Sequence, residues 1–336
     1  MRRRGLIRSV LAGAIAVTVL AGCSSKDDAD KPTRDPVVAA VAPAATATPA
    51  GEVTPSAAIR DLLADPGTGI LATITDPGTT VVLLDKATGA TRTVTLPAAA
   101  ASLSLGKPGE FLIAVPGKIL RVEAATGALT EVKVDGDVHA AALRADGDLI
   151  AGLAGGKILV LSPDGAVRET ISGLVSADAI DTSTDTVVVL DRRQTAVTEL
   201  NLIDHRLGLT LRAGDGAATM IGDHFGRRIV TDTAGNQLLV YTADPLVLRQ
   251  GFPVGSSPYA LAYEQRSETV WVTLTGTNEV VGYDLSTGIP VEVGRYPTVR
   301  QPNTVTIDDR TGDMFVGSGT GDGLQRIGAD QRKRGQ

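Results

Sequence analysis

The chain is poor in several residue types, and each shortage excludes a class of protein. Its 336 residues include one Cys, one Trp and three His, and only 3% are aromatic. A single Cys excludes an intramolecular disulfide framework and a Cys-based zinc site. The formal net charge is -6, whereas a general nucleic-acid binder carries an excess of basic residues, so we expect no nucleic-acid partner. The hydrophobic content of 43% excludes wholesale disorder.

The sequence also lacks the short motifs that carry common catalytic chemistry. It contains no H-E-x-x-H metal motif, no phosphate-binding loop with its Lys, no G-x-S-x-G nucleophile turn and no Cys/His cluster. We therefore predict no catalytic residue, no metal and no cofactor.

The first 23 residues have the features of a bacterial lipoprotein signal. Four arginines precede the apolar run Val10 to Leu20, which is too short to span a bilayer and suits a signal peptide. The run ends in Leu20-Ala21-Gly22-Cys23, which resembles a lipobox. We predict a signal peptide over 1-22, acyl chains such as palmitate on Cys23, and anchoring at the extracytoplasmic face of the cell membrane. The arginines leave general-secretory and twin-arginine export both open.

A Pro/Ala/Thr-rich stretch follows the predicted anchor. Residues 23-56 resemble a spacer because Pro recurs among Ala, Thr and Asp, and such a composition buries too little apolar surface to fold alone. Its threonines fit O-glycosylation and a bare linker equally. Val37 to Val41 is the exception, since this run can form a strand. We expect a disordered tail over 331-336, with its basic residues either free or touching anionic lipid.

Between residues 57 and 330, short β-rich runs recur at intervals of about forty residues. The repeated unit is a β-run, a turn and a second β-run, as in the segment from Thr80 to Leu96. Four strands per unit and seven units predict an all-β, seven-bladed β-propeller with four antiparallel strands per blade. Turns such as Asp85 to Gly89 should join the third and fourth strands. The seventh unit lacks an outer strand, so we expect residues within 37-53 to supply it.

One repeat resembles a known propeller family. Val254 to Gly288 reads VGSSPYALAYEQRSETVWVTLTGTNEVVGYDLSTG. It is similar to the YVTN repeat of YncE-like seven-bladed propellers, with a V-G-x-x-P start, a VWVT-like run and an N-x-V-x-x-x-D-x-x-T-G unit. With the lipobox and the Ala/Arg-rich composition, the chain resembles actinobacterial propeller lipoproteins of the mycobacterial LppL type. The resemblance implies a fold and a location more than a chemistry.

Propellers bind ligands where the inner strands begin, around the central channel. Polar residues predicted at these positions are His139, Asp178, Tyr259 and Asn303. Arg192 and Arg193 should lie on the rim of the same opening, where a guanidinium can bind a carboxylate or phosphate through two hydrogen bonds. We expect Asp191, Asp232 and Asn278 on that rim too. Each of these residues also has a purely structural interpretation as a strand start, a turn former or a solvated loop tip.

Two functions fit this sequence. The first is a cell-envelope lipoprotein whose propeller binds an envelope protein or a small polar ligand without catalysis. The alternative is a propeller enzyme of the lyase or lactonase type, with its site at the channel mouth. The enzyme interpretation gains if His139 and Asp178 lie within about 4 Å of each other and both face a pocket.

Overall fold

The structure is a computed structural model that describes residues 33-332. The predicted signal peptide, Cys23 and residues 333-336 lie outside the described residues. Strands make up almost all of the regular structure, and one short 3-10 helix, η1 (Ala329-Gln331), comes near the end. Among residues 33-332, none of the helices is long and apolar enough to cross a membrane.

Twenty of the strands form five antiparallel sheets of four. In four of these sheets the strands follow chain order, and in the fifth the N-terminal strand β1 lies beside β26. The sheets are β2 (Ile59-Ala64), β3 (Ile70-Thr75), β4 (Thr80-Asp85), β5 (Thr91-Thr95); β12 (Ala179-Asp181), β13 (Val187-Asp191), β14 (Ala196-Asn201), β15 (Arg206-Arg212); β16 (Ala217-Gly222), β17 (Arg227-Asp232), β18 (Gln237-Thr242), β19 (Val247-Pro253); β20 (Pro258-Glu264), β21 (Thr269-Leu274), β22 (Glu279-Asp284), β23 (Val291-Pro297); and β24 (Pro302-Asp308), β25 (Asp313-Ser318), β26 (Leu324-Ile327), β1 (Glu52-Thr54).

The remaining six strands form a single larger sheet. They are β6 (Ser102-Leu105), β7 (Glu110-Glu123), β8 (Leu129-Leu143), β9 (Leu149-Leu153), β10 (Ile158-Leu161) and β11 (Val167-Ile171). The first half of β8 pairs with β7 and its second half pairs with β9, so one continuous strand joins what the sequence predicts as two blades. The propeller class is confirmed, but the predicted count of seven separate blades is wrong: the strands form six sheets.

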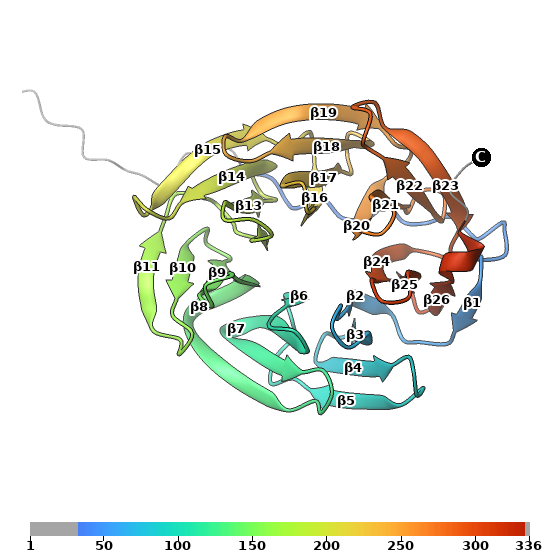
Figure 1. Ribbon diagram of the computed structural model, residues 1–336, viewed down its shortest axis with the longest axis horizontal. Coiled ribbons are helices and arrows are strands. Elements are labelled where there is room, and N and C mark those ends of the chain that lie inside the picture. The colour runs from blue at the N-terminus through green and yellow to red at the C-terminus, as the bar shows by residue number, and fades with distance from the viewer. Residues whose placement is uncertain (1–32, 333–336) are drawn as a thin grey trace, which may run out of the picture. The chain divides into compact units, whose positions relative to one another are not determined.

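The sheets are arranged in a ring (Figure 1). Seven strands lie nearest the axis, because the six-stranded sheet contributes both β6 and the second half of β8. The others are β2, β12, β16, β20 and β24. The four candidate residues predicted at inner-strand starts lie within about two residues of the observed starts, so they do lie around the channel.

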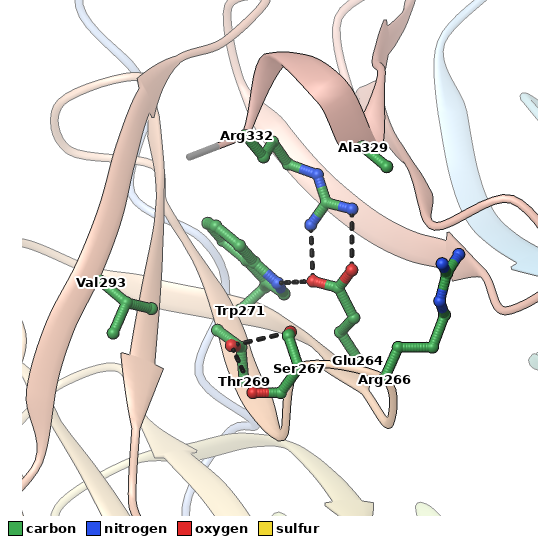
Figure 2. A pocket seen from close by; sticks show the side chains of 8 residues that line it. All are labelled: Glu264, Arg266, Ser267, Thr269, Trp271, Val293, Ala329 and Arg332. Carbon is green, nitrogen blue, oxygen red and sulfur yellow. Dashed lines mark hydrogen bonds and ion pairs between the residues drawn. The ribbon is translucent and has the colours of Figure 1, made fainter. Parts of the chain in front are cut away.

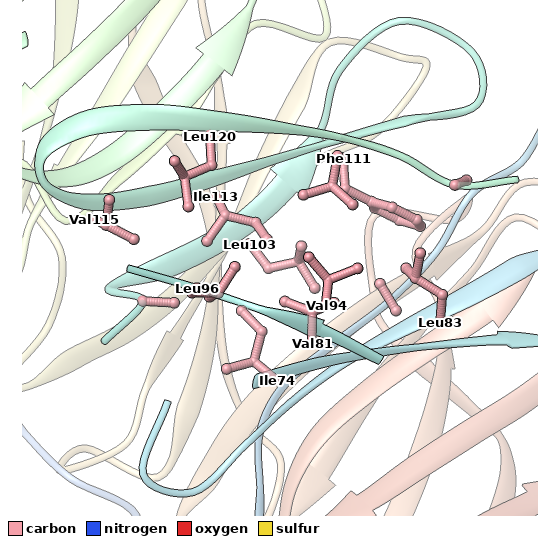
Figure 3. Close-up of a cluster of buried hydrophobic side chains, with 14 residues drawn as sticks. Ile74, Val81, Leu83, Val94, Leu96, Leu103, Phe111, Ile113, Val115 and Leu120 are labelled. Carbon is pink, nitrogen blue, oxygen red and sulfur yellow. The ribbon is translucent and has the colours of Figure 1, made fainter. Parts of the chain in front are cut away.

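The N-terminal segment closes the ring, as predicted. Strand β1 pairs antiparallel with β26, and Val53 lies opposite Gln325. The closing strand falls at the end of the predicted range 37-53, and Val37 to Val41 is not a strand. Apolar side chains hold neighbouring sheets together: Ile74 and Val81 pack against Leu103 and Phe111 between the first sheet and the next (Figure 3). Because aromatics are scarce, such interfaces are filled mainly by Val, Leu, Ile and Ala.

The turns between third and fourth strands use the predicted chemistry. Asp85 accepts hydrogen bonds from the Ala87 N-H at 2.8 Å and from the Thr88 hydroxyl at 2.8 Å. Gly89 has a φ of 73°, a conformation in which a side chain is strained. These Asp residues therefore form turns, on the opposite side of the ring from the starts of the inner strands.

Candidate functional site

His139 and Asp178 lie side by side at the channel mouth. His139 is on β8 where that strand becomes an inner strand, and Asp178 immediately precedes β12. The His139 Nδ1 atom is 3.5 Å from Asp178 Oδ1, and its Nε2 atom is 3.6 Å from Asp137 Oδ2. The imidazole is 37% exposed and the Asp178 side chain 11% exposed. The distance part of the condition set for the enzyme interpretation, a separation within about 4 Å, is therefore met.

The electrostatics of this pair favour a charged imidazole. The hydrogen bond with Asp178 raises the pKa of His139 above its ordinary value, against the opposing effect of partial burial. Burial disfavours the ionised form of Asp178, but the hydrogen bonds from His139, Ser176 and the Arg192 N-H outweigh it and lower its pKa. Both ring nitrogens of His139 face carboxylates, so neither offers a free lone pair to a substrate. The arrangement suits a hydrogen-bond donor or a general acid better than a general base.

A hydrogen-bond network fixes Asp178 in place. Its Oδ2 atom accepts from the Ser176 hydroxyl at 2.5 Å and from the Arg192 N-H at 2.8 Å. The Ser176 Oγ atom also lies 2.8 Å from Asp191 Oδ1, so its single hydrogen is shared between the two carboxylates, and Asp191 accepts the Gln194 N-H at 2.9 Å. Asp191 is fully buried, so it shapes the turn after β13 and does not lie on the exposed rim as predicted.

The other predicted site residues do not join this pair. Tyr259 packs against an apolar cluster, and its carbonyl accepts the Thr231 hydroxyl. Asn303 accepts the Gln301 side-chain amide at 2.9 Å. Asp232, predicted on the rim, is fully buried and accepts the Asp215, Gly216 and Gly235 N-H groups.

The hydrogen-bond partners of Arg192 and Arg193 differ from the prediction. The Arg192 guanidinium donates to the Val37 carbonyl, so it binds this chain's own backbone rather than presenting two free donors. Arg193 is exposed, and its carbonyl accepts the Arg34 N-H at 3.0 Å.

Residues 34-50 lie along the mouth of the ring, and we call this segment the strap (Figure 1). Its main chain is bound by ring side chains: the Ala40 N-H donates to Ser257 Oγ at 3.1 Å, and Gln301 bonds both the Ala40 carbonyl and the Ala42 N-H. Asn278 donates to the Pro43 carbonyl at 3.0 Å. The part of the predicted spacer from residue 34 onward is therefore held on the ring, because its peptide groups find polar partners without forming a strand.

An axial cavity of about 470 Å³ opens inside the ring beside Asp178. It is lined by inner strands and by the six-stranded sheet, with apolar side chains such as Leu103, Leu143 and Met220. Asp178 and Asp181 line it too, but His139 does not. The condition for the enzyme interpretation is therefore only half met: the two side chains are close together, but only Asp178 faces the cavity.

The C-terminal residues form a second, smaller pocket at the outer edge. Arg332 binds Glu264 through two hydrogen bonds of 2.7 and 3.0 Å, and the Trp271 indole N-H donates to the same carboxylate at 2.9 Å (Figure 2). The Arg332 side chain is 3% exposed and Glu264 is 9% exposed. The prediction of a disordered tail starting at residue 331 is thus wrong for Gln331, which ends η1, and for Arg332, which is buried in an ion pair.

Sequence reasoning missed the strap, this ion pair and Asp61 on β2. Asp61 accepts the Leu62 and Leu103 N-H groups, both at 2.9 Å, and burial raises its pKa to about 6. Nothing in the local sequence distinguishes Asp61 from a solvated residue on an alternating strand. The strap differs from Asp61 in this respect, because its residues Val37 to Val41 stand out in the sequence as an unusual apolar run. In the part of the chain that the structure describes, no group of three or more His, Cys, Asp or Glu side chains is placed to hold a metal ion.

Comparison with known proteins supports the fold. No family model matches the chain, and no curated protein matches it. Solved structures do: a streptogramin B lyase has a TM-score of 0.68 at 14% identity, covering 83% of this chain and 96% of that one. Virginiamycin B lyase from Staphylococcus aureus has a TM-score of 0.66 at 15% identity, covering 80% and 94%. Kuenenia stuttgartiensis hydrazine synthase has a TM-score of 0.69 at 12% identity, covering 83% and 97%. At such low identities the likeness establishes a β-propeller and no activity.

Proposed function

We propose that this chain is a cell-envelope lipoprotein, anchored through Cys23, whose propeller binds a ligand in the axial cavity. The cavity carries the proposal: it has the size of a small-molecule site, mostly apolar walls and a few convergent polar groups at its mouth. The strap supports a binding role as well, because the same face of the ring already recognises an extended polypeptide through its main chain.

The closer relationship to YncE-like propellers of the actinobacterial, LppL-like type belongs to the same proposal. Its support is the position of the repeat. The V-G-x-x-P start leads into β20, which begins at its Pro258. The VWVT run lies within β21, and the N-x-V-x-x-x-D-x-x-T-G unit covers β22 and the turn after it.

Anchoring is tested by labelling cells that express the full chain with an alkyne analogue of palmitate. We expect label on the wild type, none on Cys23→Ala, and unchanged labelling of the control Ser24→Ala. Cell fractionation should move Cys23→Ala out of the membrane pellet. Persistence of Cys23→Ala in the membrane, or an unlabelled wild type, would refute the anchor.

A lyase activity is the second candidate. The 3.5 Å contact between His139 and Asp178 favours it, as do the neighbours named as streptogramin B and virginiamycin B lyases. In this function His139, held by Asp178, would protonate the leaving group as its bond to carbon breaks, and solvent water would take up the proton lost from the adjacent carbon. The test is incubation of the purified protein with virginiamycin B, followed by mass spectrometry. Turnover that is lost in His139→Ala and kept in His205→Ala supports catalysis, whereas intact substrate leaves the binding function as the better account.

A further inference from the structure

The axial cavity has charge of one sign only. Among the side chains that line it, Asp178 and Asp181 carry formal charge, and none is Lys, Arg or His. The rest of the lining is apolar or bears hydroxyl groups, as at Ser102 and Ser104. Low-dielectric walls strengthen the field of the carboxylates, so the cavity attracts cations and repels anions.

The two lining carboxylates are not equally available to a ligand. Asp181 is paired with Arg228, whose side chain is fully buried, so its charge is already compensated. Asp178 is paired with His139, but only through Oδ1 and at 3.5 Å, while its Oδ2 accepts the Ser176 hydroxyl and the Arg192 N-H. The Oδ1 atom keeps the capacity to accept a further hydrogen bond.

Asp61 is a third carboxylate near the cavity, although it is not one of the lining residues. It lies two residues before Leu63, which lines the cavity, and its carboxylate accepts the N-H of Leu103, which also lines it. Within residues 33-332, no Lys, Arg or His forms an ion pair with Asp61. Its negative charge is stabilised by two backbone N-H groups only, so a cation in the cavity would supply the missing counter-charge.

We propose that the axial cavity binds a small organic cation with an apolar body, such as an alkylammonium ion, with Asp61 and Asp178 as its counter-ions. The proposal rests on the proposed ligand-binding function and deepens it by naming the ligand class. Leu103, Leu143 and Met220 would cover the apolar body. A hydrated metal ion fits less well, because most of the lining offers no oxygen ligands.

The test uses three probes of matched chain length: hexyltrimethylammonium, hexan-1-ol and hexanoate. Each is titrated by calorimetry into the full chain carrying Cys23→Ala, so that neither lipid nor detergent competes for the probes. We expect hexyltrimethylammonium to bind at least about tenfold more tightly than the neutral and anionic probes, as one added contact between a cation and a carboxylate would give. Asp178→Asn should weaken its binding about tenfold. The control Asp313→Asn removes a carboxylate of equal exposure, 11%, from an ion pair outside the cavity and should change nothing.

A pH titration of the unsubstituted cavity keeps the proposal testable if Asp178→Asn fails to fold. The carboxylates and the imidazole involved are those of Asp61, Asp137, Asp178, Asp181, Asp223 and His139, and the guanidinium groups are those of Arg192 and Arg228. The two guanidinium groups stay charged, and protonation of Asp61 and of His139 both oppose a cation. Binding of hexyltrimethylammonium should therefore fall about tenfold between pH 7.5 and pH 5, given an Asp61 pKa of about 6.

The outcomes separate this inference from the proposed function. Equal binding of all three probes, or binding that does not change with pH, overturns the organic-cation assignment and leaves a binding cavity in place. No saturable binding of any probe at millimolar concentration overturns both the assignment and the cavity's role. Palmitate labelling at Cys23 is independent of either result.

Discussion

Removing Arg332 from its ion pair with Glu264 should destabilise the ring strongly, because it leaves a buried carboxylate without its cation. Replacing Arg332 with Met leaves the Glu264 carboxylate, 9% exposed, with hydrogen bonds from the Trp271 N-H and Ser267 but without its cation. Removing one partner of a buried ion pair costs about 3-5 kcal/mol. The variant also loses the guanidinium that lies 5.1 Å from the centre of the Trp271 ring.

A loss of about 3 kcal/mol lowers the Tm of a domain of this size by about 6 °C, at roughly 2 °C per kcal/mol. The assay is thermal unfolding followed by circular dichroism at pH 7. The control is Arg206→Met, which breaks an ion pair with Asp204 whose side chains are 63% and 53% exposed. Such surface pairs contribute about 0-1 kcal/mol, so the control should shift the Tm by less than about 2 °C.

The pH dependence gives a second, independent readout. Burial opposes ionisation of Glu264, but the hydrogen bonds from Arg332 outweigh it and lower its pKa in the folded state. The wild type therefore gains stability from this group above the unfolded-state value of 4.5, and loses it as the pH falls through the lower folded value. In Arg332→Met burial acts without the guanidinium, the folded pKa lies above 4.5, and acidification should stabilise the variant. An unchanged Tm with an unchanged pH profile would refute this role of the Arg332-Glu264 ion pair.

Three further outcomes follow from the structure. Deleting residues 24-56 removes the strap and the closing strand, and should lower the Tm by more than 10 °C in a calorimetric scan, whereas an unchanged Tm means that the ring closes without them. Because the pKa of His139 is raised by Asp178, its stabilising effect is fully present below pH 6.5 and lost as the pH rises through the folded value; His139→Gln should flatten that part of the stability profile in urea titrations, and an unaltered profile contradicts the pairing. Phe111→Ala should cost about 3-5 kcal/mol in the same titrations, and a cost below 1 kcal/mol would contradict tight packing between the first two sheets.

The sequence was sufficient for the features that depend on local periodicity. Alternating β-runs and Gly-containing turns give the strands, their order and the positions of the inner-strand starts, including His139 and Asp178. The number of sheets was not predictable in this way. Whether β8 is one continuous strand or two separate strands depends on its partners β7 and β9. The local sequence pattern is the same in both cases.

Within the candidate site, only the closeness of His139 and Asp178 was predictable, because each lies at the start of an inner strand beside the channel. The strap could not be placed, because its partners Ser257 and Gln301 are more than 200 residues away and bind peptide groups that carry no sequence signal. Asp61 was missed for a related reason: its counterpart, the Leu103 N-H, is a main-chain group. Arg332 looked like part of a polar tail because Glu264 lies on another sheet.

Ring closure has a consequence for how the chain is made. The Ala50 carbonyl is bound by the side chain of Gln325, which comes 275 residues later in synthesis, and β1 has no sheet to join until β26 exists. The main-chain groups of this first segment therefore lack their hydrogen-bond partners until the last strand of the domain has been made. Contacts of such long sequence separation slow folding, and a ribosome-bound or translocating chain should accumulate as an open arc until its last residues emerge.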